Sequence, residues 1–121
     1  MAECYLRSLK PAWSVRSAGT SAVRGAPATE NSRLAVAEIG LDLSEHRACP
    51  IGDLEDEEFD RVLVMGPEHL TAVKPWGGEL LSALCGENSP VLDPYGGSLE
   101  RYRETLSELR RHLDFFKEAS Q

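Results

Sequence analysis

Residues 91–102 have the sequence VLDPYGGSLERY, and this stretch decides the fold because it joins a short apolar strand to the longest helix. The strand candidate, residues 90–92, stops at an Asp-Pro turn that two glycines extend. Ser98 is a typical helix N-cap. The helix that we expect after Ser98 has apolar residues at alternating steps of three and four, namely Leu99, Tyr102, Leu106, Leu109, Leu113 and Phe116.

Outward from this stretch, strand and helix patterns alternate along the chain. Residues 62–65 (VLVM) are a continuous apolar run, typical of a strand covered on both faces, and residues 14–17 are a shorter strand candidate. The region 76–89 fits either helix or strand. Helical patterns occupy residues 2–9, 29–39 and about 67–74. This alternation predicts an α/β fold with a parallel sheet, in one domain over residues 1–121.

Residue types at the helix ends support this division. Thr29 and Gly40 are typical of an N-cap and a left-handed C-cap, and they bracket the second helical pattern. The first helical pattern follows Met1 directly, so no preceding side chain can cap it. Its other end is set by Lys10-Pro11, because proline disfavours helical geometry in the residue before it.

Composition and charge exclude several classes of protein. The 121 residues contain 13 Lys and Arg against 20 Asp and Glu, a net charge of -7, which argues against nucleic acid as a partner. No apolar run reaches the roughly 18 residues of a membrane helix, and no signal-peptide pattern is present. We therefore expect a cytoplasmic protein without a membrane partner. Residues 53–60 (DLEDEEFD) are strongly acidic but lack the spacing of a calcium loop, which favours a solvated surface over a metal site.

The loops that leave the predicted strands are the candidate sites, because open α/β sheets bind ligands at the carboxyl ends of their strands. These loops are residues 17–20 (SAGT), 66–67 (GP) and 93–97 (DPYGG). Asp93 stands at the end of an apolar strand, next to a proline that restricts the chain. Such a carboxyl can be held over a pocket as a general acid. Taken alone, the same pattern is more often only a turn.

Four segments stand in a recognisable order: 15–21 (VRSAGTS), 40–46 (GLDLSEH), 62–65 (VLVM) and 91–102 (VLDPYGGSLERY). Together they resemble the low-molecular-weight protein tyrosine phosphatase family, and most closely its bacterial branch, which includes protein-arginine phosphatases. The resemblance covers essentially the whole chain. It implies a three-layer α/β/α fold with a four-stranded parallel sheet.

The resemblance implies a hydrolase that acts on phosphorylated proteins or small phosphomonoesters, without metal or other cofactor. In this family a Cys thiolate, within a loop of Cys, five residues and Arg, attacks phosphorus, and an Asp protonates the leaving group. Asp93 matches that Asp, and Tyr95 matches the aromatic residue at the substrate entrance. Ser17 and His46 match residues that brace the phosphate loop. The alternatives are an ordinary strand-end hydroxyl for Ser17 and a surface-loop histidine for His46.

The nucleophile loop has no match in this sequence. The family's loop ends Cys-Arg-Ser-Pro-Met-Ala-Glu, whereas this sequence begins Met1-Ala2-Glu3. None of Cys4, Cys49 and Cys85 has an arginine six positions later. We therefore expect a domain that is truncated at its N-terminus and lacks the central first strand and the phosphate loop. We expect these 121 residues to be inactive, and a form with the loop to be a phosphatase.

Two other functions are weighed against this one. The first is a natural non-catalytic relative that uses the face around Asp93 and Ser17 as a binding or regulatory module. The second is a redox enzyme of the arsenate reductase type, which needs a cysteine relay after residues 62–65, where Gly66-Pro67-Glu68 stands instead. The resemblance attributes the choice between phosphotyrosine and phosphoarginine to the absent loop, so both substrate classes stay open.

Overall fold

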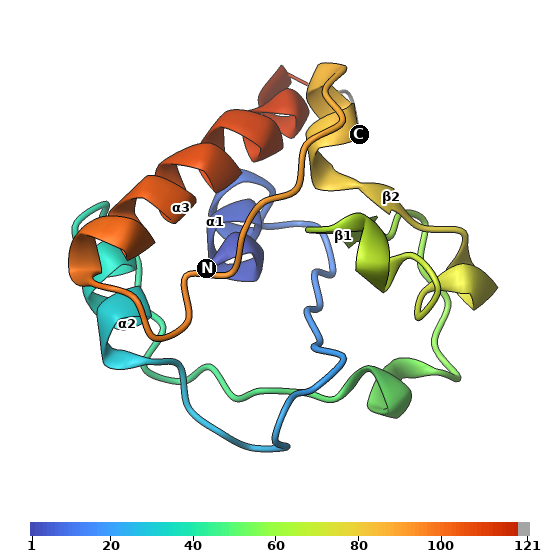
Figure 1. The fold of residues 1–121 in the computed structure, drawn as a ribbon, viewed down its shortest axis with the longest axis horizontal. Coiled ribbons are helices and arrows are strands. Elements are labelled where there is room, and N and C mark those ends of the chain that lie inside the picture. The colour runs from blue at the N-terminus through green and yellow to red at the C-terminus, as the bar shows by residue number, and fades with distance from the viewer. Residues whose placement is uncertain (119–121) are drawn as a thin grey trace.

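Three α-helices and a short parallel sheet form the frame of the molecule, which a computed structural model describes over residues 1–118. The helices are α1 (Ala2–Leu9), α2 (Glu30–Ala37) and α3 (Leu99–Leu113), and the strands are β1 (Leu63–Val64) and β2 (Glu79–Leu80). Figure 1 shows the three helices together on one side and the sheet on the other. Short 3-10 helices lie between them: η1 (Ile51–Leu54), η2 (Pro67–His69), η3 (Lys74–Trp76), η4 (Leu81–Cys85) and η5 (Asp114–Glu118).

The predicted helix ends are confirmed at their caps. The Thr29 hydroxyl accepts the backbone N–H of Ser32 at 3.3 Å, and Gly40 has the left-handed φ of 81° that glycine tolerates. Ser98 caps α3 in the same way as Thr29 caps α2. As expected, Met1 occupies the N-cap position of α1 without a side-chain cap.

The parallel sheet is confirmed, but its second strand differs from the prediction. Leu63 lies beside Glu79 and Val64 beside Leu80, so the strand predicted at 62–65 pairs with β2. The region 76–89, which fitted helix or strand, contains both β2 and η4.

The strand predicted at residues 90–92 is wrong. A single backbone hydrogen bond, from the N–H of Val91 to the carbonyl of Met65 at 2.8 Å, joins this segment to the end of β1. Pro90 has no N–H to donate, and a ladder cannot form from one bond.

Two further predicted elements also take other forms. Residues 14–17 form no strand, since within residues 1–118 no backbone hydrogen bond pairs them with another strand. The carbonyl of Val15 accepts instead from the Arg7 guanidinium at 2.7 Å. The helix predicted at 67–74 is instead the short η2, followed by turns up to η3, which begins at Lys74.

Helix α3 joins two apolar clusters into one core. Its N-terminal half contributes Tyr102 and Leu106 to a cluster with α2, and its C-terminal half contributes Leu109 and Leu113 to a cluster with α1 and η4. These positions are buried, which confirms the apolar stripe predicted from the spacing. No helix within residues 1–118 is long and apolar enough to cross a membrane.

Candidate functional site

A tight turn fixes the backbone around Asp93. The side-chain oxygen Oδ1 of Asp93 accepts the backbone N–H of Tyr95 at 3.0 Å, which closes an Asx turn. One residue later, the N–H of Gly97 donates to the carbonyl of Pro94 at 2.7 Å. The carboxyl of Asp93 is exposed, so one of its oxygens is oriented by the backbone while the side chain remains open to a ligand.

The two glycines of this turn are required for different reasons. Gly96 has a φ of 79°, a conformation that residues with a side chain rarely adopt. Gly97 has no space for a side chain, since an added Cβ would lie 2.8 Å from the Pro94 carbonyl oxygen and 3.1 Å from Arg101. The sequence Pro-Tyr-Gly-Gly therefore specifies one turn geometry.

Helices α2 and α3 hold this turn from its other side. Asn31, in the first turn of α2, donates through Nδ2 to the carbonyl of Gly97 at 3.2 Å. The first turn of α2, residues 95–97 and Tyr102 line a shallow cavity of about 280 Å³. Tyr102 is buried, whereas the ring of Tyr95 is 75% exposed at the edge of the cavity. Tyr95 is therefore accessible to a ligand beside Asp93.

Ser17 is connected to the first turn of α1. Its hydroxyl donates to the carboxylate of Glu3, and Glu3 also forms an ion pair with Arg7 at 2.9 Å. Arg7 binds the carbonyl of Val15, so two side chains of α1 hold the segment that ends at Ser17. Ser17 itself is exposed.

His46 lies in a loop that pairs with residues 19–27. Next to it, the N–H of Ala48 donates to Ala26 at 2.7 Å, and the carbonyl of Cys49 accepts from Gly19 at 3.0 Å. The His46 side chain is half-buried, and within residues 1–118 it has no hydrogen-bond partner.

The cysteines are placed as structural or surface residues. Cys4 lies within α1, with Sγ 3.7 Å from the carbonyl of Asp42, and burial raises the pKa of its thiol. A raised pKa decreases the thiolate fraction, the reverse of what a nucleophile needs. Cys49 is half-buried and Cys85 is exposed.

The structure brings Asp93 and Tyr95 together on one turn and places Ser17 and His46 on neighbouring loops elsewhere. Within residues 1–118, no hydrogen bond joins Asp93 to Ser17 or His46. Sequence analysis missed Asn31 and Glu3, because their contacts join residues 66 and 14 positions apart. The one indication in the sequence is that Glu3 and Asn31 are polar residues close to the start of a predicted helix.

Comparison with known proteins identifies the fold and the family. Residues 1–120 match the family described as "Low molecular weight phosphotyrosine protein phosphatase". The probable low molecular weight protein-tyrosine-phosphatase EpsP of Ralstonia solanacearum is 31% identical over 118 residues, covering 94% of this chain and 81% of the relative. The protein-arginine-phosphatase of Bacillus subtilis is 32% identical over 106 residues, covering 82% and 70%.

A solved structure gives the same result. The low molecular weight protein tyrosine phosphatase from T. tengcongensis superposes with a TM-score of 0.82 at 30% identity, over 95% of this chain and 86% of that one. The α/β fold predicted from the sequence is confirmed. The chain belongs to the low molecular weight phosphotyrosine protein phosphatase family of hydrolases.

Proposed function

We propose that this protein removes phosphate from phosphorylated protein side chains through a cysteinyl-phosphate, with Asp93 as general acid. The proposal applies to a form in which a Cys-x5-Arg loop stands ahead of Met1. The supporting observation is the turn around Asp93, which orients an exposed carboxyl beside an exposed aromatic ring. A catalytic acid must be held within hydrogen-bond reach of the leaving group, and such a turn provides that restraint.

The carboxyl geometry assigns a role to each oxygen of Asp93. Because Oδ1 accepts the N–H of Tyr95, the transferable proton is carried by Oδ2. In the first step, the Cys thiolate of the added loop bonds to phosphorus while the bond to the leaving group breaks, and Oδ2 gives its proton to the leaving atom. In the second step, the Asp93 carboxylate takes a proton from water, whose oxygen bonds to phosphorus as the sulfur–phosphorus bond breaks.

The other candidate residues assist this chemistry in the proposal. Tyr95 forms one wall of the substrate entrance, which agrees with its 75% exposure. Ser17 and His46 brace the phosphate loop, and the imidazole of His46 has no hydrogen-bond partner within residues 1–118 that would compete with this role. The helix dipole of α1 would stabilise the phosphoryl oxygens at its N-terminus.

Relatives of this chain are named for two substrate classes, phosphotyrosine and phosphoarginine. We propose a phosphorylated protein of one of these classes as the substrate. The leaving atom is then the tyrosine oxygen or a guanidinium nitrogen, and both accept a proton from an acid. We also propose a cytoplasmic location, which the three free cysteines support.

The test compares residues 1–121 with the same chain extended by an apolar strand and Cys-x5-Arg-Ser-Pro. We expect no hydrolysis of p-nitrophenyl phosphate by the shorter chain and clear turnover by the extended one. In the extended chain, Asp93→Asn should lower kcat by about 10²–10⁴-fold with little change in KM. Asp60→Asn, at an exposed position whose carboxylate forms no ion pair within residues 1–118, is the matched control and should leave kcat unchanged. Normal turnover by the Asp93 variant would refute the general-acid role.

A non-catalytic binding module is the second candidate. The observation in its favour is that none of the three cysteines stands in a Cys-x5-Arg pattern. This function predicts that residues 1–121 bind phosphate or a phosphopeptide without turnover. Titration by NMR distinguishes the two, because the absence of binding at millimolar phosphate would contradict the binding module and leave the phosphatase proposal intact.

A further inference from the structure

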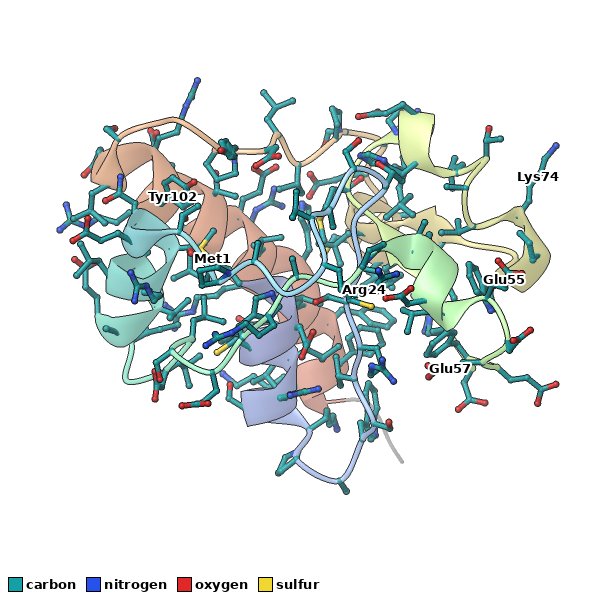
Figure 2. All side chains as sticks on the ribbon, turned by 90° about the horizontal axis from the view of Figure 1, so that it is seen from below. Met1, Arg24, Glu55, Glu57, Lys74 and Tyr102 are labelled. Carbon is teal, nitrogen blue, oxygen red and sulfur yellow. The ribbon has the colours of Figure 1, made fainter. Side chains whose placement is uncertain are left out.

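An aromatic groove lies at the end of the molecule that carries the sheet and η3. It has a volume of about 510 Å³ and is lined by Glu58, Phe59, Asp60, Pro75 and Trp76. Figure 2 shows the neighbouring Glu55, Glu57 and Lys74 at this end, with Tyr102 at the opposite end. Because Tyr102 lines the cavity beside Tyr95, this aromatic groove is separate from the candidate site.

The aromatic floor of the groove is fixed by local contacts. Phe59 and Trp76 pack edge to face, with ring centroids 6.0 Å apart. The indole N–H of Trp76 donates to the carbonyl of Glu57 at 2.8 Å, so the polar atom of the ring is satisfied. Both rings are only half-buried, and their remaining surface is available to a ligand.

The rim of the groove carries negative charge without partners. In the acidic stretch 53–60, Asp53 pairs with Arg24 and Glu57 pairs with Arg16. The other acidic side chains of the stretch are exposed, and within residues 1–118 they form no ion pair: Glu55, Asp56, Glu58 and Asp60. Clustered carboxylates repel one another, and a cation bound between them relieves that repulsion.

Arg61 follows the groove residue Asp60 in the sequence, but its guanidinium contacts residues outside the groove. The guanidinium of Arg61 lies over the rings of Phe115 and Phe116, 5.8 and 5.4 Å from their centroids. It also pairs with Glu79 at 3.3 Å. Arg16 is paired with Glu57, and Lys74 is exposed. The rim therefore keeps its negative charge, in a chain with a net charge of -7.

We propose that this groove binds an arginine-bearing segment of a partner protein. A guanidinium stacks on aromatic faces and donates paired hydrogen bonds to carboxylates, and the groove presents both groups. A metal ion fits less well, because the described residues contain no group of three or more acidic, His or Cys ligands arranged around one point. The inference is independent of the proposed catalytic function, since the groove shares no residue with the candidate site.

Fluorescence anisotropy with the 121-residue chain tests this proposal. The probe is a labelled peptide of alternating glycine and arginine, and a peptide with glutamine in place of arginine is its control. We expect saturable binding of the arginine peptide alone, weakening as salt concentration rises. The indole N–H signal of Trp76 should shift in NMR spectra during the titration.

Two double variants separate groove binding from attraction to the net charge. Glu58→Gln with Asp60→Asn removes two rim charges at exposed positions and should weaken binding about fivefold or more. Glu45→Gln with Glu104→Gln removes two exposed charges elsewhere and should change affinity less than twofold. Equal weakening by both double variants would overturn the proposal. It would also be overturned if the arginine peptide failed to bind at millimolar concentration, or if the glutamine peptide bound equally well.

Discussion

Replacing Gly97 with alanine tests whether the turn that carries Asp93 is as closely packed as its contacts indicate. The new Cβ would lie 2.8 Å from the carbonyl oxygen of Pro94 and 3.1–3.2 Å from the side chain of Arg101. The backbone must move to relieve these contacts. That movement would also break the hydrogen bond from Asn31 to the Gly97 carbonyl.

The magnitude follows from three contributions. Forced packing of an added group costs about 1–3 kcal/mol, and loss of the Asn31 hydrogen bond costs about 0.5–1.5 kcal/mol. Alanine also lowers the conformational entropy of the unfolded chain, which stabilises the folded protein by about 0.4–1 kcal/mol. The net loss in the free energy of unfolding is about 2 kcal/mol, which lowers Tm by about 8 °C for a chain of this length.

Urea unfolding followed by circular dichroism measures this loss, with Gly52→Ala as the matched control. Gly52 lacks a positive φ, and nothing lies within 4 Å of its added Cβ. The control should therefore be neutral or stabilising, by up to about 1 kcal/mol. If Gly97→Ala were as stable as Gly52→Ala, the close packing of the turn, and with it the restraint on Asp93, would be refuted.

Three further predictions concern other parts of the chain. Thr29→Ala removes the side-chain cap of α2 and should lower the free energy of unfolding by about 1 kcal/mol, measured by urea titration against the neutral replacement Thr29→Ser. At pH 8, iodoacetamide should modify the exposed Cys85 before Cys4, whose thiol pKa is raised by burial, and mass mapping that found Cys4 modified first would contradict this placement. Burial and the hydrogen bond to Asp114 raise the pKa of Tyr5, so the stability that Tyr5 contributes is present below its unfolded pKa of about 10 and is lost as pH rises through the folded pKa. Tyr5→Phe should reduce this loss in melting curves recorded from pH 9 to 12, and an unchanged alkaline slope would show that Tyr5 is not responsible.

The sequence predicts α1, α2 and α3 well, because their boundaries depend on neighbouring residues, whereas the helix expected at 67–74 is not formed. Thr29, Gly40 and Ser98 act through contacts within one turn of their own position. The buried face of α3 can be predicted from the spacing of its apolar residues alone, because an amphipathic helix packs its apolar side against the core. These features depend little on distant parts of the chain.

The strands are predicted less well, since a strand exists only through its partner. Residues 14–17 and 90–92 have suitable side chains, yet the first has no ladder partner within residues 1–118 and the second makes one backbone bond. β2 lies in a Gly-rich region whose pattern fitted helix and strand equally. The same limit applies to the site, where Asn31 contacts the Asp93 turn across 66 positions.

The contacts of the Asp93 turn connect it to β1, α2 and α3. Val91 joins it to the end of β1, Asn31 joins it to α2, and Ser98 begins α3 directly after it. Within residues 1–118, no hydrogen bond connects residues 93–98 to α1, whose N-terminus would face a phosphate loop. The carboxyl is therefore positioned by the same helices that bury the core, whether or not a loop precedes α1. For this reason Asp93→Asn changes the proposed chemistry without removing a contact on which the fold depends, and loss of turnover in that variant can be assigned to the proton transfer itself.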